Sequence, residues 1–147
     1  MKTPNHILLV ESDPDDARLL KAAFDAARIM NPIEVATSER AAMDYFRPDG
    51  APLEPSRLPA LTILALRLPI LNNFRLLRWI RSQPELREIS LFVLAGVGLS
   101  EEDTKAHELG SDCYGEKPAD FSGTVQLVKM LEQKFLNPHV GHCGGGR

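Results

Sequence analysis

Runs of apolar residues and stretches with helical periodicity alternate along the chain. The first run, at residues 6–10, is almost entirely apolar, as expected of a strand that is covered on both faces. Four similar runs follow, and we predict strands at 6–10, 33–36, 61–66, 89–95 and 112–116. Apolar residues that recur every three or four positions predict helices at 14–29, 38–46, 73–81, 100–110 and 120–136.

This βα alternation predicts an α/β protein with a doubly wound parallel sheet. Right-handed crossovers leave few topologies for five such units, and we expect the flavodoxin-like (βα)5 fold with strand order 2-1-3-4-5. A site in such a fold lies at the carboxyl ends of the first, third and fourth strands. The candidate site positions are therefore 11–13, 65–68 and 95–98, joined by Lys117 and Pro118 after the fifth strand.

The position of the longest predicted loop indicates a single domain. Residues 47–59 are polar and rich in proline, so we predict an exposed loop between the second helix and the third strand. Only two strands and two helices precede this loop, which is too little for a separate domain. We predict one domain over residues 1–136 and a flexible C-terminal tail over residues 137–147.

Composition and charge narrow the class of protein. A chain of 147 residues buries roughly 70% of its unfolded surface, so it needs no disulfide or metal to hold its core, and both cysteines are interpreted as thiols. A net charge of -3 argues against a nucleic-acid partner bound through a basic surface. No signal-peptide pattern or apolar run of ~20 residues is present, so we expect a soluble cytoplasmic protein without a membrane span.

Three segments carry a resemblance to a known family. They are ILLVESDPDD at 7–16, LALRLP at 64–69 and GSDCYGEKP at 110–118. In this order and at these separations they resemble the receiver domains of bacterial two-component response regulators, in particular the single-domain regulators of the chemotaxis type. The resemblance covers the chain through Leu136. It implies a receiver fold and a role in phosphorelay signalling.

In that family, charged groups at the strand ends carry out phosphoryl transfer. Two adjacent acids follow the first strand, an aspartate at the end of the third strand accepts the phosphoryl group, and a hydroxyl residue and a lysine end the fourth and fifth strands. A Mg²⁺ ion binds the acids and the phosphoryl group. The cation and the lysine are needed because negative charge gathers on the transferred oxygens.

Several of these positions lack the required side chain. The resemblance places Glu11 at the first acid but Ser12 at the second, which is the main metal ligand of the family. The phosphoacceptor position falls on Ala65, whose methyl group cannot accept a phosphoryl group, and the hydroxyl position falls on Ala95. Nucleophile, metal ligand and hydroxyl are replaced while the hydrophobic scaffold is kept.

Lys117 and Tyr114 keep their family positions. The resemblance makes Tyr114 the switch aromatic, although ordinary strand packing would explain a tyrosine there equally well. With no acceptor aspartate beside it, the Lys117 ammonium lacks its usual partner, so we predict that it contacts Glu11. The alternative is that Lys117 points into solvent. Because a partly exposed ion pair contributes only about 0 to 1 kcal/mol, stability measurements alone would hardly distinguish these alternatives.

The resemblance therefore implies a pseudo-receiver that signals by protein binding. We expect no enzymatic activity, no phosphorylation at Ala65, no metal site and no cofactor, the family's Mg²⁺ included. The family's partner surface corresponds here to Ser100 to Leu136, so a histidine kinase or another signalling protein is expected to bind there. A homodimer is a separate expectation, with no surface assigned to it.

Two other functions stay open at this stage. A conventional regulator would be phosphorylated at another acid such as Asp13, which a one-residue shift of the motif would make the second acid. A small molecule would bind in the crevice where the strand order reverses. An enzyme is disfavoured because these loops contain neither a glycine-rich phosphate cradle nor a Ser-His-Asp or Cys-His set.

Overall fold

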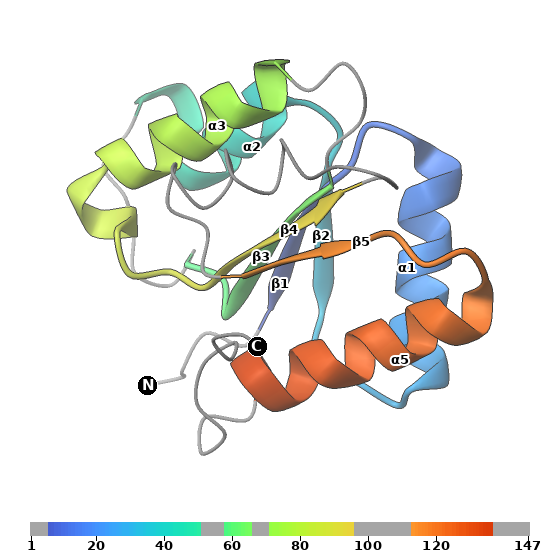
Figure 1. Ribbon diagram of the computed structural model, residues 1–147. Helices are drawn as coiled ribbons and strands as arrows, with labels where there is room; N and C mark the ends of the chain where they lie inside the picture. The colour runs from blue at the N-terminus through green and yellow to red at the C-terminus, as the bar shows by residue number, and fades with distance from the viewer. Residues whose placement is uncertain (1–5, 51–57, 66–70, 96–112, 137–147) are drawn as a thin grey trace.

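A parallel sheet forms the centre of the molecule, with helices on both of its faces (Figure 1). The structure is a computed structural model, and the residues that it describes are 6–50, 58–65, 71–95 and 113–136. The strands are β1 (Ile7–Val10), β2 (Ile33–Ala36), β3 (Leu61–Ala65), β4 (Leu91–Ala95) and β5 (Cys113–Glu116). The predicted order of β2, β1, β3 and β4 is confirmed, and β5 pairs with β4 on the far side.

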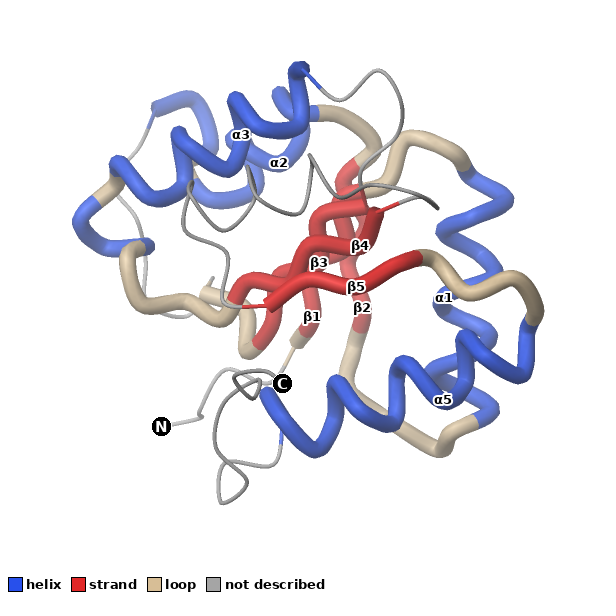
Figure 2. Tube along the Cα trace, viewed as in Figure 1, coloured by secondary structure: helices blue, strands red, loops and turns tan. Residues whose placement is uncertain are grey.

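Among the described residues, two helices cover each face of the sheet (Figure 2). Helices α1 (Pro14–Ala26) and α5 (Phe121–Leu131) lie on one face, and α2 (Glu39–Phe46) and α3 (Leu71–Ser82) lie on the other. Alternate strand residues feed two separate apolar clusters, because successive side chains of a strand point to opposite faces. Leu9 packs in the cluster under α1 and α5, whereas Leu8 packs in the cluster under α2 and α3.

Helix α1 ends earlier than its apolar periodicity predicts, at Ala26 instead of residue 29. Arg28 adopts a positive φ of 64°. Its N–H donates to the carbonyl of Asp25 at 3.0 Å, and the N–H of Ile29 donates to the carbonyl of Phe24 at 2.9 Å. This is a Schellman motif. Ile29 and Phe24 are buried in one cluster, so the apolar pattern continues in packing after the helix has ended.

Other predicted boundaries also shift by a few residues. The predicted loop over residues 47–59 contains a 3-10 turn at Pro48–Gly50, and the predicted last helix is divided into α5 and a π-helical segment at Glu132–Leu136. The predicted helix at 100–110 and the predicted tail at 137–147 lie outside the described residues. No helix within the described ranges has the length and apolar character needed to cross a membrane.

Candidate functional site

The candidate site lies at the edge of the sheet where β1, β3 and β5 end. Glu11 directly follows β1, Ala65 is the last residue of β3, and Lys117 directly follows β5. Parallel strands all end at the same edge of their sheet, so this topology gathers residues that are far apart in the sequence. The predicted site positions that fall on described residues therefore share one end of the sheet, whereas 66–68 and 96–98 lie outside the described residues.

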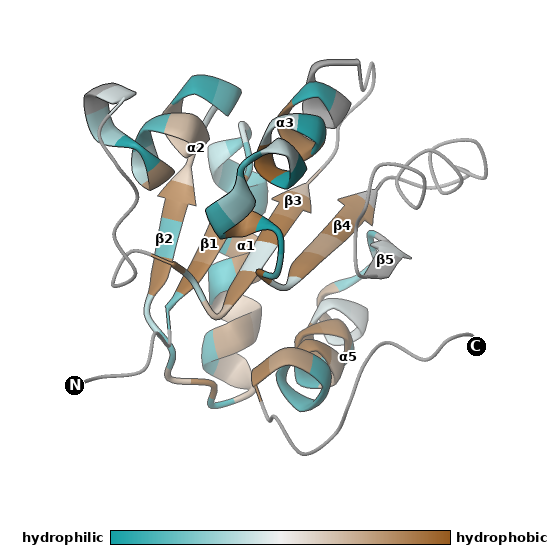
Figure 3. Ribbon diagram, turned by 90° about the vertical axis from the view of Figure 1, so that its left-hand side faces the viewer, coloured by the Kyte–Doolittle hydropathy of each residue, from teal (hydrophilic) through white to brown (hydrophobic). Residues whose placement is uncertain are grey.

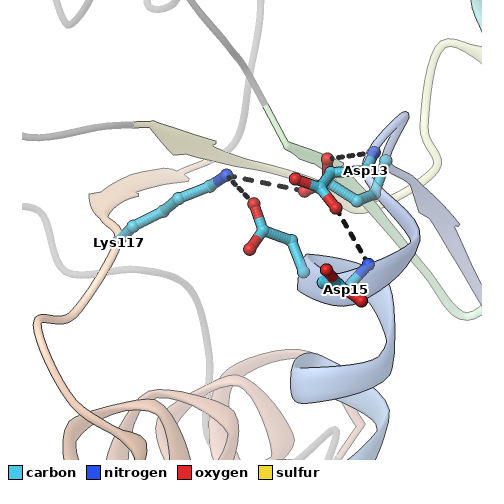
Figure 4. Close-up of polar contacts among 5 residues, drawn as sticks. Asp13, Asp15 and Lys117 are labelled. Carbon is cyan, nitrogen blue, oxygen red and sulfur yellow. Dashed lines mark hydrogen bonds and ion pairs between the residues drawn. The ribbon is translucent and has the colours of Figure 1, made fainter.

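Lys117 makes two ion pairs at this edge (Figure 4). Its Nζ lies 3.5 Å from Oε1 of Glu11 and 3.4 Å from Oδ2 of Asp16, which belongs to α1. The predicted contact between Glu11 and Lys117 is confirmed. Because the Glu11 side chain is only 3% exposed, its carboxylate depends on protein groups to replace water.

Glu11 also holds the loop that leads into α1. Its Oε2 accepts a hydrogen bond of 3.0 Å from the backbone N–H of Asp13. Asp13 is the N-cap of α1, and its Oδ1 accepts a hydrogen bond of 2.9 Å from the N–H of Asp15 (Figure 4). The two carboxylates thus form a chain of contacts from Lys117 through Glu11 to the first turn of α1.

Ala65 and Ser12 line a pocket on the other side of this loop. Ala65 is buried at 3% exposure, whereas Ser12 is exposed. The pocket has a volume of about 390 Å³ and is also lined by Val10, Thr37, Ser38, Glu39 and Arg40. The side chain that β3 contributes to this pocket is therefore the methyl group of Ala65, which cannot accept a phosphoryl group.

Ala95 and Tyr114 are described through their backbones alone. Ala95 is the last residue of β4 and pairs with Glu116, while Tyr114 lies within β5 and pairs with Val93. The sheet thus places Ala95 at the same edge as Ala65. The side chain of Tyr114 is outside the described part of the chain, so its role as a switch aromatic stays a prediction.

Asp16 is the site residue that sequence reasoning missed. Asp15 and Asp16 both suit the first turn of a helix, where the helix dipole favours negative charge, so the sequence does not distinguish them. The structure separates them, because Asp15 pairs with Arg18 at 3.1 Å whereas Asp16 turns toward Lys117. A usable signal was the fold itself, which brings the start of the first helix and the end of the fifth strand to the same edge.

The oxygen donors at this edge differ from those of a Mg²⁺ site. A divalent cation of this kind prefers several carboxylate, carbonyl or water oxygens in regular geometry. Both oxygens of Glu11 are engaged by Asp13 and Lys117, and Ser12 and Ala65 supply no carboxylate. Across the described ranges, no three His, Cys, Asp or Glu side chains are grouped as a metal site. The residues present do not fit the ion that the family binds.

Comparison with known proteins relates the chain to response regulators. It is 28% identical over 133 residues to the response regulator Rcp1 of Synechocystis sp. (strain ATCC 27184 / PCC 6803 / Kazusa), covering 90% of each chain. No protein-family model matches the sequence.

Solved structures give the same relationship. The crystal structure of the phosphorylated cyanobacterial phytochrome response regulator RcpA superposes with a TM-score of 0.75 at 27% identity, over 92% of this chain and 95% of that one. The bacteriophytochrome response regulator RtBRR superposes with a TM-score of 0.67 at 30% identity, over 89% of this chain and 78% of that one. These similarities extend over nearly the whole chain, so they concern the entire fold and not a local motif.

Proposed function

From its place in the response-regulator family, as a receiver of two-component signalling and not an enzyme, we propose that this chain signals without accepting a phosphoryl group. In this proposal it is a pseudo-receiver that holds one conformation and offers that conformation to a protein partner. Without a ligand that distinguishes two states, no population shift between them occurs.

One observation carries the proposal, namely the arrangement of Ala65 and Lys117. The end of β3 supplies a buried methyl group, and the lysine that would neutralise a phosphoryl group is held by Glu11 and Asp16. RcpA, by contrast, was solved in a phosphorylated form. The Mg²⁺ ion of the family is absent from the proposed mechanism, because the donor set described above does not suit it.

The proposed partner is a histidine kinase or another signalling protein. The proposed contact surface runs from Ser100 to Leu136, and the structure describes its second part, from β5 through α5 to Leu136. Phe121 at the start of α5 is 42% exposed, which leaves an apolar side chain on this surface. A receiver that cannot change its conformation would act by binding to its partner through this surface.

The test is a titration of ¹⁵N-labelled protein with Mg²⁺ and beryllofluoride, which mimics a phosphoryl group. We expect no change in amide resonances. The matched control is the double variant Ser12→Asp/Ala65→Asp, which restores both missing carboxylates and should show saturable shifts near Lys117. Saturable shifts of Glu11 or Lys117 in the unchanged protein would refute the proposal.

A second experiment addresses phosphorylation at Asp13. Its carboxylate is engaged as the N-cap of α1, which supports a structural role. We expect no incorporation of label from a radioactive small-molecule phosphodonor. Incorporation that disappears in Asp13→Asn would show instead a conventional regulator with a displaced acceptor.

A further inference from the structure

Strand β2 lies at the edge of the sheet, opposite to β5 (Figure 3). It pairs with β1 on one side, and within the described residues no strand pairs with its other side. An edge strand presents a row of backbone donors and acceptors to which another extended segment can add. This edge lies on the opposite side of the sheet from β5, which belongs to the partner surface proposed above, and its groove shares Glu11 with the site at Lys117.

The hydrogen bonds to β1 reveal which backbone groups of β2 face outward. The N–H of Ile7 donates to the carbonyl of Pro32 at 2.8 Å, and the N–H of Glu11 donates to the carbonyl of Ala36 at 3.0 Å. Backbone groups of a strand alternate in direction, so the even-numbered residues face β1. The N–H and C=O groups of Ile33 and Val35 therefore point to the outer edge.

The side chains of these same residues line a groove of about 700 Å³ between β2 and α1. Phe24 and Ile29 are buried apolar residues of its lining, and Met30 is 83% exposed. Charged residues also line the groove, namely Glu11, Arg18, Lys21 and Asp25. The outward backbone groups and the apolar groove thus belong to one continuous surface, which we name the β2 edge: Phe24, Ile29, Met30, Ile33 and Val35.

Glu34 lies between Ile33 and Val35 and is exposed. Because strand residues alternate, its side chain points to the face of the sheet away from the groove. A strand added to β2 would place one of its own side chains opposite Glu34, and an opposite charge in such a cross-strand pair is stabilising. This position therefore selects the charge of whatever pairs with β2.

We propose that the β2 edge binds an extended segment of a partner protein in which two apolar residues flank a basic one. The backbone of the segment pairs with Ile33 and Val35 and extends the sheet, which is a known mode of peptide recognition. Its apolar side chains enter the groove beside α1, and its basic side chain lies opposite Glu34. Backbone pairing supplies affinity, and the groove and Glu34 supply selectivity.

A second copy of this chain fits the β2 edge less well. Antiparallel pairing of two β2 strands centred on Glu34 would set this carboxylate directly against its counterpart, and like charges directly opposite one another are destabilising. Charge complementarity therefore favours a partner with a basic residue at this position.

The probe for the test is a cyclic β-hairpin peptide whose outer strand carries valine-lysine-valine, since a rigid hairpin lowers the entropy cost of binding. We expect saturable shifts of the amide resonances of Ile33, Val35 and Thr37 on titration into the ¹⁵N-labelled protein. A hairpin with valine-glutamate-valine should bind about threefold more weakly, as expected for a cross-strand charge pair.

The decisive experiment changes the charge of Glu34 in the protein. Glu34→Lys should reverse the preference between the two hairpins, and Glu34→Gln, which tests the point if the lysine variant folds poorly, should remove it. The matched control Asp44→Lys changes an exposed acid on α2 and should leave the preference unchanged. Absence of shifts at the β2 edge, or an unchanged preference in the Glu34 variants, would overturn the proposal.

Sedimentation and amide hydrogen exchange of the protein alone test whether a second copy occupies the β2 edge. We expect a monomer at all concentrations, with amide exchange of Ile33 and Val35 that is independent of protein concentration. A dimer that forms with concentration and protects these two amides would show that the chain pairs with itself, and would overturn the proposal of a basic partner segment.

Discussion

Lys117 joins two carboxylates that differ in their exposure to water. Glu11 is 3% exposed and Asp16 is 39% exposed, while Lys117 itself is 26% exposed. Water can replace a partner of Asp16 but not readily a partner of Glu11. The contact with Glu11 is therefore the one whose loss has the larger consequence for stability.

We predict that Lys117→Met lowers the free energy of unfolding by about 1 to 3 kcal/mol, because a buried acceptor loses a charged donor. The matched variant Arg18→Met breaks the exposed pair with Asp15, whose side chains are 75% and 80% exposed, and should have an effect within about 0.5 kcal/mol. Urea denaturation measures both. Equal effects of the two variants would show that Lys117 is as solvated as Arg18.

At the scale of the elements, side-chain caps determine where three helices begin. Asp13 accepts from the N–H of Asp15, Ser38 from that of Ala41, and Asp120 from that of Gly123. Each cap satisfies a backbone donor that the helix leaves unpaired. For α1 this cap is coupled to the site, since the N–H of Asp13 donates to Glu11.

We predict that Asp13→Ala destabilises the protein by about 1 kcal/mol, whereas Asp13→Asn, which keeps a capping oxygen, has a much smaller effect. Thermal unfolding followed by circular dichroism measures the difference. An Asn variant as unstable as the Ala variant would indicate that the negative charge of Asp13, and not its cap, stabilises the start of α1.

At the scale of the whole molecule, the sheet holds two apolar layers and one polar edge. Leu8 and Leu64 belong to the layer under α2 and α3, and Leu9 and Ile63 belong to the layer under α1 and α5. These layers form the fold that the chain shares with the solved response regulators, and Lys117, Glu11 and Asp16 lie outside both layers. The packing of the core and the polar contacts of the candidate site therefore rest on different residues.

The proposal that this chain has no Mg²⁺ site predicts that its melting temperature does not respond to Mg²⁺. An ion that binds only the folded state at ten times its Kd adds about 1.4 kcal/mol of stability, which corresponds to a rise of roughly 4 °C. We expect no such rise at 10 mM MgCl₂, with KCl of equal ionic strength as the control. A rise specific to Mg²⁺ would reveal a cation site.

The sequence by itself determined most of the strands and helices among the described residues. Strands covered on both faces are nearly all apolar, so β1 and β3 were predicted to within one residue at each end. That Ser12 and Ala65 stand where the family has carboxylates stays a prediction from the motif positions.

Only the tertiary structure decided how the remaining charges and the sheet edge are used. The turn to positive φ at Arg28 ended α1 early, and the approach of Lys117 made Asp16 a site residue while the adjacent Asp15 stayed on the surface. The groove at Ile33 and Val35 likewise needs α1 and an edge strand together. Local patterns report which face of an element is apolar, whereas partners brought from distant parts of the chain depend on how the elements pack.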